Sequence, residues 1–348
     1  MPASLFDAPQ PDRADLEACR TLLQGGSKSF HAASLLLPGD LRDSATALYA
    51  FCRIADDAVD GGGDIAVALP LLRQRLDLIY NGRPRGIPAD RAFAAVVRRH
   101  SIPRALPEAL LEGFAWDGEG RRYATLAALQ GYAARVAGSV GVMMALLMGQ
   151  RDPRVLASAS DLGVAMQLTN IVRDVGEDAR NGRVYLPEDW LRAGGIDPDA
   201  WLLAPRFDTR LQPILQRLLD EADTLYARAG AGIGWLPWRC RPGMHAARLL
   251  YAEIGTVVRE RGYDSVNARA RVSLGRKLEL LPQVLGAALR GGGALAEQLG
   301  ETRFLVDAVG AQNLSPPAVA VPRQSRAEWL LELFERLERE QLLSRGSG

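Results

Sequence analysis

Polar side chains that could bind a metal recur at helical spacing between Gln167 and Asp178. Asn170, Asp174 and Asp178 stand four residues apart, so they share one face of a predicted helix, with Gln167 one turn earlier on nearly the same face. An Asn-Gly helix stop at 181–182 places both carboxylates in the last turns, where the helix dipole is negative. The like-charge spacing and the dipole each cost roughly 0.3–1 kcal/mol, so together they indicate a compensating cation.

A second pair of carboxylates repeats this arrangement near the start of the chain. Asp56 and Asp60 are also four residues apart and stand directly before the helix breaker at 61–63. Carboxylates and water are the ligands of hard divalent ions such as magnesium, which bridge to phosphate oxygens. Arg53 and Arg173 stand beside the two acidic pairs, and a guanidinium binds phosphate oxygens in a bidentate manner. The pattern predicts a metal-diphosphate site.

The rest of the sequence suits the ionisation of an allylic diphosphate. Such a reaction needs the charge of the leaving group neutralised and a dry apolar cavity for the carbocation. A mostly apolar helical chain can supply this cavity. The hydroxyls of Ser27 and Ser29 could add hydrogen-bond donors to the diphosphate.

Composition excludes several other classes of function. The 348 residues are 48% hydrophobic and 24% charged, with a formal net charge of +1, which does not favour nucleic-acid binding. The three cysteines and three histidines are scattered, which argues against structural zinc, disulfides and a Ser-His-Asp triad. Residues 1–20 lack the pattern of a signal peptide, and the apolar window 136–148 is too short to span a bilayer. We therefore expect a cytoplasmic protein.

Helical periodicity dominates the chain and no run of alternating residues indicates a strand, so we predict an all-α protein. Asp40 is a candidate N-cap. The three methionines at 143, 144 and 148 fit core packing better than the alternative, the lining of a long lipid tunnel. The predicted helices cover residues 15–24, 40–60, 65–80, 90–100, 107–116, 126–148, 153–180, 209–228, 244–261, 273–290 and 326–343.

The predicted organisation is a single domain with additions at both ends. Residues 1–14 form an N-terminal tail, and 15–290 form the catalytic domain. A linker follows over 291–325, after the glycines at 291–293, and is Pro-rich and weakly patterned at 314–324; residues 326–348 form a C-terminal amphipathic helix and tail. Docking of this last helix on its own domain is the first interpretation, and contact with a membrane or a partner is the alternative.

Several ordered motifs together resemble the squalene and phytoene synthase family. The resemblance extends over roughly residues 15–290 and is closest to the bacterial, phytoene-forming branch. The motifs that carry it are Ser27–Phe30, Tyr49–Asp60, Phe114–Asp117, Tyr132, Val136–Gly141, Gln167–Asp178 and Gly182–Pro187.

This resemblance implies a fold, a reaction and a set of site residues. The fold would be a class I terpenoid synthase-like helical bundle with a central cavity. Two geranylgeranyl diphosphates would condense head to head through prephytoene diphosphate to 15-cis-phytoene, the first committed step of carotenoid biosynthesis. Magnesium, or manganese instead, would be held by Asp56, Asp60, Asn170, Asp174 and Asp178. The residues that would contact the diphosphate or the substrate are Ser27, Ser29, Arg53, Gln167 and Arg173. Those that would shape the pocket are Phe30, Tyr49, Tyr132 and Tyr185. Tyr251 and Arg269 would also bind substrate, but the residues around them match the family's motif less closely.

Within that set, the resemblance assigns catalysis to the four aspartates with Tyr49 and Arg53. Two alternatives remain open. One is a dehydrosqualene or presqualene diphosphate synthase that uses farnesyl diphosphate. Such an enzyme would differ from a geranylgeranyl-using one in the depth of its substrate tunnel. The other is a non-catalytic helical scaffold with the same fold.

The expected partners follow from the same resemblance. The glycine-rich stretch 230–234 follows a predicted helix and lacks the dinucleotide-binding spacing, so no NADPH is expected. Because the product is a very apolar hydrocarbon, we expect peripheral association with the cytoplasmic membrane face and contact with downstream carotenoid enzymes.

Overall fold

The computed structural model describes residues 11–26, 33–60 and 65–312, with the side chain of Asp60 excluded. Within these ranges the chain is helical and contains no strand, as predicted. The main helices are α1 (Arg13–Gly26), α3 (Gly39–Asp60), α4 (Ile65–Tyr80), α5 (Pro88–His100), α6 (Ala105–Gly118), α7 (Leu126–Ala133), α8 (Ser139–Leu147), α9 (Pro153–Arg180), α10 (Glu188–Ala193), α11 (Pro198–Leu203), α12 (Leu211–Ile233), α13 (Arg241–Glu260), α14 (Leu274–Glu279), α15 (Leu281–Ala288) and α16 (Arg303–Gly310).

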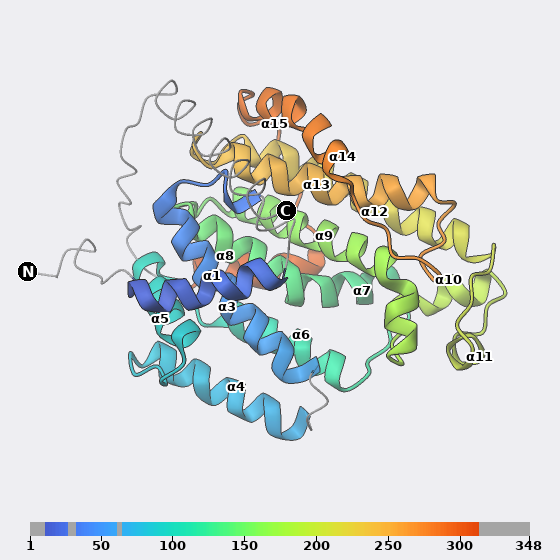
Figure 1. Ribbon diagram of the computed structural model, residues 1–348, viewed down its shortest axis with the longest axis horizontal. Helices are drawn as coiled ribbons and strands as arrows, with labels where there is room; N and C mark the ends of the chain where they lie inside the picture. Colours follow the sequence, from blue (N-terminus) through green and yellow to red (C-terminus); the bar gives the residue numbers. More distant parts are fainter. Residues whose placement is uncertain (1–10, 27–32, 61–64, 313–348) are drawn as a thin grey trace, which may run out of the picture.

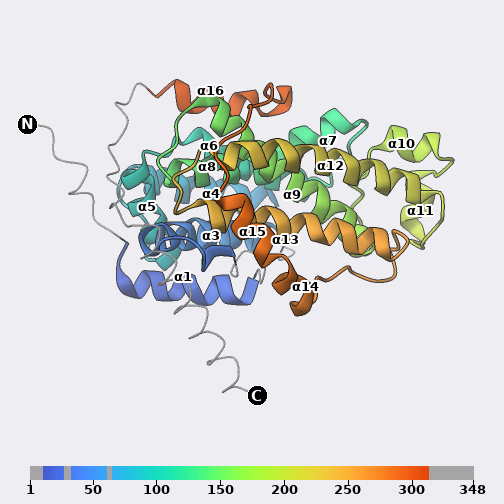
Figure 2. The same ribbon diagram turned by 90° about the horizontal axis from the view of Figure 1, so that it is seen from above.

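Helix α9 is the central helix of the bundle. Asp152 caps its N-terminus by accepting a hydrogen bond from the Arg154 N–H, and Pro153 occupies the first helical position. At the other end Asn181 is the C-cap and Gly182 has a φ of 75°. The helix packs against α8, α12 and α13 (Figures 1 and 2). Its length and apolar composition would allow it to cross a membrane, but 78% of the apolar window is buried inside the protein.

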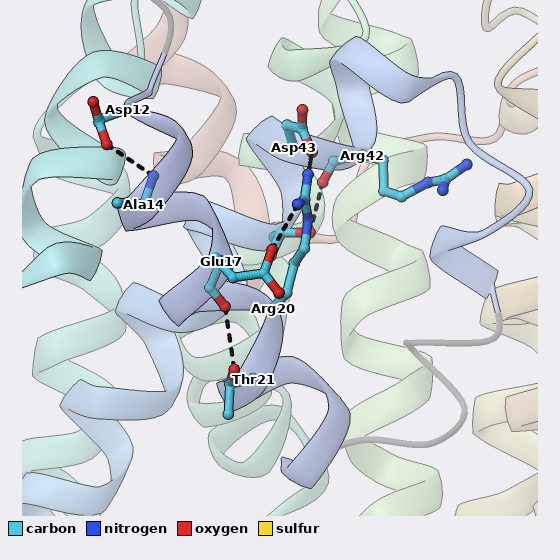
Figure 3. A network of polar contacts seen from close by, with 8 residues as sticks. Asp12, Ala14, Glu17, Arg20, Thr21, Arg42 and Asp43 are labelled. Atoms are coloured by element: carbon cyan, nitrogen blue, oxygen red, sulfur yellow. Dashed lines mark hydrogen bonds and ion pairs between the residues drawn. The ribbon is translucent and has the colours of Figure 1, made fainter. Parts of the chain in front are cut away.

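The N-terminal helices form one side of the bundle and position the first acidic motif. Helix α1 packs on α3 and α5 (Figure 2). Arg20 of α1 donates to Glu17 on its own helix and to Asp43 on α3, at 3.0 and 2.9 Å (Figure 3). On the buried side of α3, Phe51 stacks on Phe93 of α5 with ring centroids 4.3 Å apart. These contacts fix the position of α3, whose last two turns carry Asp56 and Asp60.

The structure departs from the predicted helices in four places. The long helix expected over 126–148 is interrupted by a π-helical turn, η2 (Ala134–Gly138). The helix expected over 273–290 is two short helices, α14 and α15, and two more helices, α10 and α11, occupy a region for which none was predicted. Asp40 lies within the first turn of α3 and is not its N-cap.

The predicted linker over 291–325 is wrong for its first part. Residues 303–310 form α16, in which Leu305, Val306 and Val309 are buried in the main core. Arg228 of α12 donates to the Glu297 carbonyl and pairs with the buried Asp161 of α9 at 2.9 Å. The packed helical core therefore extends at least to α16. The N-terminal residues 1–10 and the predicted C-terminal helix lie outside the described residues.

Candidate active site

One large apolar cavity lies in the centre of the bundle, with an empty volume of about 960 Å³ including its mouth. Side chains of α3, α8, α9 and α13 and residues of the π-helical turn η2 form its wall. Such a π turn replaces the regular hydrogen-bond pattern of a helix and is frequent at functional sites. The lining residues are Ala33, Ser34, Leu37, Leu48, Tyr49, Cys52, Val136, Ala137, Val140, Gly141, Met144, Leu162, Gly163, Met166, Gln167, Asn170, Gly243, Met244, Ala247 and Tyr251.

Both predicted acidic motifs follow directly from residues that line this cavity. On α3, Tyr49 and Cys52 face the cavity, and Asp56 is one turn beyond Cys52. On α9, Gln167 and Asn170 face the cavity, with Asp174 one turn further. The ends of the two helices therefore stand at the same end of the cavity.

Tyr251 of α13 connects the two motifs. It lines the cavity and interacts electrostatically with Tyr49 and with Arg173. Burial raises the pKa of the Tyr49 hydroxyl above its usual range, so Tyr49 is neutral near pH 7. The predicted pocket residues Tyr49, Tyr251 and Gln167 are thus brought together at one cavity.

The arginines beside the motifs are paired with carboxylates. Arg173 donates to both oxygens of Asp174, at 2.8 and 2.6 Å. Arg53 pairs closely with Asp57 at 2.7 Å and more distantly with Asp56 at 3.6 Å. Guanidinium groups held in this way have donors that can exchange a carboxylate oxygen for a phosphate oxygen.

Arg269 reaches the second motif from a segment that follows α13. Its guanidinium pairs with Asp174 at 2.8 Å and with Glu177 at 3.1 Å. This segment turns at Tyr263, whose φ of 64° is in the left-handed region. The next residue, Asp264, accepts hydrogen bonds from the backbone N–H groups of Val266 and Asn267. Although its motif matched less closely, Arg269 lies beside the second predicted acidic motif.

The C-terminal end of α9 concentrates negative charge in a buried place. The pKa of the Asp178 carboxyl is raised to about 8, mainly by burial and next by the charge of Asp174. In addition, Asn170 Oδ1 is buried and has no hydrogen-bond partner. A nearby cation would accept the unpaired Asn170 oxygen as a ligand, and it would stabilise the ionised form of the buried Asp178 carboxyl. These donor atoms suit a hard divalent ion.

Tyr132 and Tyr185 do not line the large cavity. Their hydroxyls donate to the two oxygens of Asp117, at 2.8 and 2.6 Å, and their rings stack with centroids 5.2 Å apart. Tyr123 completes this aromatic cluster, 5.1 Å from Tyr132. Asp117 contributes to the raised pKa of Asp178, so the cluster lies near the second motif. The role of Asp117 as a shared acceptor was not predicted, although it ends the motif Phe114–Asp117.

Several predicted site residues cannot be placed. Ser27, Ser29 and Phe30 lie outside the described residues, as does the side chain of Asp60. Among the side chains that the structure does describe, no three acidic, histidine or cysteine groups converge on one point.

The all-helical bundle and its acidic cavity mouth define an isoprenoid synthase of the class I terpenoid type. A solved dehydrosqualene synthase has the same fold, with a TM-score of 0.72 and 32% identity, covering 79% of this chain and 96% of that one. A squalene synthase from Alicyclobacillus acidocaldarius gives a TM-score of 0.66 at 27% identity, covering 72% and 95%.

Residues 23–276 match the squalene/phytoene synthase family, and the chain belongs to this family. A phytoene synthase from Rhodobacter capsulatus is 52% identical over 87% of this chain and 92% of its own length. One from Cereibacter sphaeroides is 50% identical over 93% and 94%. The predicted fold class and family are confirmed.

Proposed function

We propose that this protein condenses two geranylgeranyl diphosphates head to head, through prephytoene diphosphate, to 15-cis-phytoene, the first committed step of carotenoid biosynthesis. The single observation that supports this most directly is the central apolar cavity, lined by Cys52 one helical turn before Asp56 and by Asn170 one turn before Asp174. The phytoene synthases that are 50–52% identical over most of the chain support the C20 substrate.

The donor set at the cavity mouth fits a divalent metal, and we propose magnesium, with manganese as the alternative. Asp56, Asp60, Asn170, Asp174 and Asp178 would hold it. When bound, the metal would neutralise the leaving diphosphate. The unpartnered Asn170 Oδ1 and the raised pKa of Asp178 are the features of this chain that support the assignment.

The protein's own groups would bind the diphosphate and protect the carbocation. Arg53, Arg173 and Arg269 would donate to phosphate oxygens after exchanging their carboxylate partners. Gln167 could add an amide donor at the mouth. Below the mouth, Tyr49 and Tyr251 present aromatic rings, and the apolar wall would exclude water from the reacting carbons.

Product analysis tests the proposal. Purified protein is incubated with magnesium and geranylgeranyl diphosphate, and separately with farnesyl diphosphate, and the hydrocarbon is identified by mass spectrometry and comparison with standards. We expect a C40 product with the absorption spectrum of 15-cis-phytoene, formed without NADPH. Turnover of farnesyl diphosphate alone would replace the proposal with a C15 activity, and no turnover of either would support a non-catalytic scaffold.

We also propose that the enzyme works at the cytoplasmic membrane face, where its product can leave water and reach the next carotenoid enzymes. The support is chemical, because a C40 hydrocarbon has no polar group and partitions into lipid. Sedimentation with anionic phospholipid vesicles during turnover tests this. Protein that stays in the supernatant while phytoene accumulates there would contradict it.

A further inference from the structure

Exposed apolar side chains gather on the two short helices α14 and α15 and the turn beside them. Leu274, at the start of α14, and Leu289, at the end of α15, are 72% and 73% exposed, and Leu278 and Trp235 are about half exposed. A single exposed leucine is ordinary, but several on neighbouring elements indicate an interaction surface. Further exposed large apolar residues lie on other helices: Val67, Leu71, Leu203 and Phe304.

Helices α14 and α15 form an amphipathic layer on the outside of the bundle. Helix α15 packs on α13, and α14 packs on α15, so both lie at the edge of the molecule (Figures 1 and 2). Leu280 and Val284 are buried on the inner side. At about 100° per residue, the three exposed leucines lie roughly 120–160° around the helix axis from these two residues. The layer therefore points its leucines away from the protein.

Trp235 is held beside the end of this layer. Its Nε1 donates to the Gly293 carbonyl at 3.0 Å, four residues after Leu289. The backbone before it is equally close, because a Cβ at Gly234 would stand 2.5 Å from the Gly291 carbonyl oxygen. A tryptophan with its N–H satisfied and its ring half exposed is typical of residues at a membrane–water interface.

The charge around these leucines is positive. Residues 271–290 contain four basic side chains and one acidic side chain, Glu279. Arg276 donates to Glu253 at 2.7 Å and pairs with Glu260 at 3.0 Å, so it offsets the two carboxylates of α13 that lie beside α14. Leucine and tryptophan beside arginine and lysine are the composition of helices that lie in the headgroup region of anionic lipid. The remaining basic residues are Arg271, Lys277 and Arg290.

This layer also covers part of the wall of the large cavity. A small buried cluster consists of Val284, Ala33, Leu36, Ala246 and Ala247. Ala33 and Ala247 also line the cavity. The exposed face of α15 is therefore on the outer side of side chains whose inner side faces the reacting hydrocarbon.

We propose that α14, α15 and Trp235 form a lipid-binding face that rests on an anionic bilayer. The leucines and the indole ring enter the boundary between headgroups and acyl chains, and Arg271, Lys277 and Arg290 lie at the lipid phosphates. This proposal rests on the proposed function, because a C40 hydrocarbon product gives the enzyme a reason to hold its cavity wall against lipid.

The test places a negative charge on the face and on a matched site elsewhere. Leu274→Glu alters α14 and Leu289→Glu alters the end of α15. Leu203→Glu on α11 is the control, because Leu203 is 89% exposed and lies outside the face. Each full-length protein is sedimented with vesicles of mixed phosphatidylglycerol and phosphatidylcholine and with vesicles of phosphatidylcholine alone, at low and high salt.

We expect Leu274→Glu and Leu289→Glu each to lower the partition coefficient on the anionic vesicles about tenfold or more, and Leu203→Glu to change it less than about twofold. Wild-type protein should bind the neutral vesicles more weakly and should lose binding to the anionic ones at high salt. Face variants that partition like Leu203→Glu would overturn the proposal. So would a change of oligomeric state on gel filtration with unaltered partitioning, which would assign the face to a second copy of the chain.

Activity in detergent solution separates this proposal from the proposed function. The face variants and the control should form product there at the wild-type rate, because none of the changed residues lines the cavity. Wild-type protein that forms no C40 hydrocarbon in detergent would contradict the proposed function. Wild-type protein that forms it but does not partition onto anionic vesicles would overturn the lipid-binding face alone.

Discussion

Gly176 lies directly against the backbone of Val266: a Cβ at position 176 would stand 2.1 Å from the Val266 carbonyl oxygen. The Gly176 N–H also donates to the Ser265 carbonyl at 3.1 Å. The contact attaches the segment after α13 to α9 between Asp174 and Asp178. Arg269, which pairs with Asp174, comes from this same segment.

Replacing Gly176 with alanine should therefore damage the site through the backbone. The added methyl would push the segment away and separate Arg269 from Asp174. We expect a loss of about tenfold or more in kcat/KM and of roughly 1–3 kcal/mol in the free energy of unfolding. Gly286→Ala on α15 is the control, because nothing lies within 4 Å of its Cβ position. Steady-state kinetics measure kcat/KM, and urea unfolding measures the free energy of unfolding. If neither changed in Gly176→Ala, the contact with Val266 would not be what holds Arg269 against Asp174.

The sequence predicted the helices that carry the acidic motifs because their signals are local. Helical spacing aligned Asn170 with Asp174, and the helix stop at 181–182 lies where the structure has it. Helix α4 agrees with its predicted bounds, Ile65 and Tyr80. Periodicity over a few turns and local stop signals are sufficient for such elements.

Contacts between distant segments were not predictable in this way. Arg269 is 95 residues from Asp174, and Tyr185 is 68 residues from Asp117. Tertiary packing alone brings these pairs together, so residue spacing along the sequence does not predict them. The same holds for α16, whose short apolar face was hidden in a glycine-rich, weakly patterned region but is buried against α9 and α6.

Asp56 should be essential for turnover while contributing little to the fold. Its side chain is 39% exposed, so Asp56→Asn is expected to leave the unfolding temperature nearly unchanged. Because a proposed metal ligand and a negative charge are lost, kcat should fall by about 100-fold or more. Asp77→Asn is a suitable control, since Asp77 is 48% exposed and pairs with Arg104, and neither residue lines the cavity. Equal activity of the Asp56→Asn and Asp77→Asn enzymes would argue against the metal role.

Asp117 should be a positioning residue for two tyrosines. It accepts from Tyr132 and Tyr185 through different oxygens, and an asparagine can accept such bonds only through its single carbonyl oxygen. Asp117→Asn should therefore lower the free energy of unfolding by roughly 1.5–3 kcal/mol, the range for a hydrogen bond to a charged group.

A double-mutant cycle with Tyr185→Phe tests this interpretation. In the Tyr185→Phe background the Asp117→Asn change should cost less, because one donor is already absent and the amide oxygen can still accept from Tyr132. Urea unfolding of the four proteins gives the coupling energy. Strictly additive losses would show that Asp117 and Tyr185 do not act as a pair.

Two buried histidines should make stability depend on pH below neutrality. The pKa of His100 is lowered to about 4, mainly by burial and next by Arg99, and the pKa of His245 is lowered to about 4, mainly by burial and next by Arg248. In the unfolded chain both have a pKa near 6.5, so between pH 6.5 and 4 the unfolded state binds more protons. Their stabilising contribution is complete above pH 6.5 and is lost as the pH falls towards 4.

The difference between wild-type protein and single His→Gln variants isolates this effect, since glutamine does not titrate. From pH 6.5 to 4, the free energy of unfolding of wild-type protein should fall relative to each variant by on the order of 1–3 kcal/mol. Asp161, whose pKa is raised to about 6 by burial, titrates in the same window with the opposite sign, but it does so equally in both proteins and cancels. Parallel pH profiles for wild type and variants would mean that His100 and His245 are protonated as readily in the fold as in the unfolded chain.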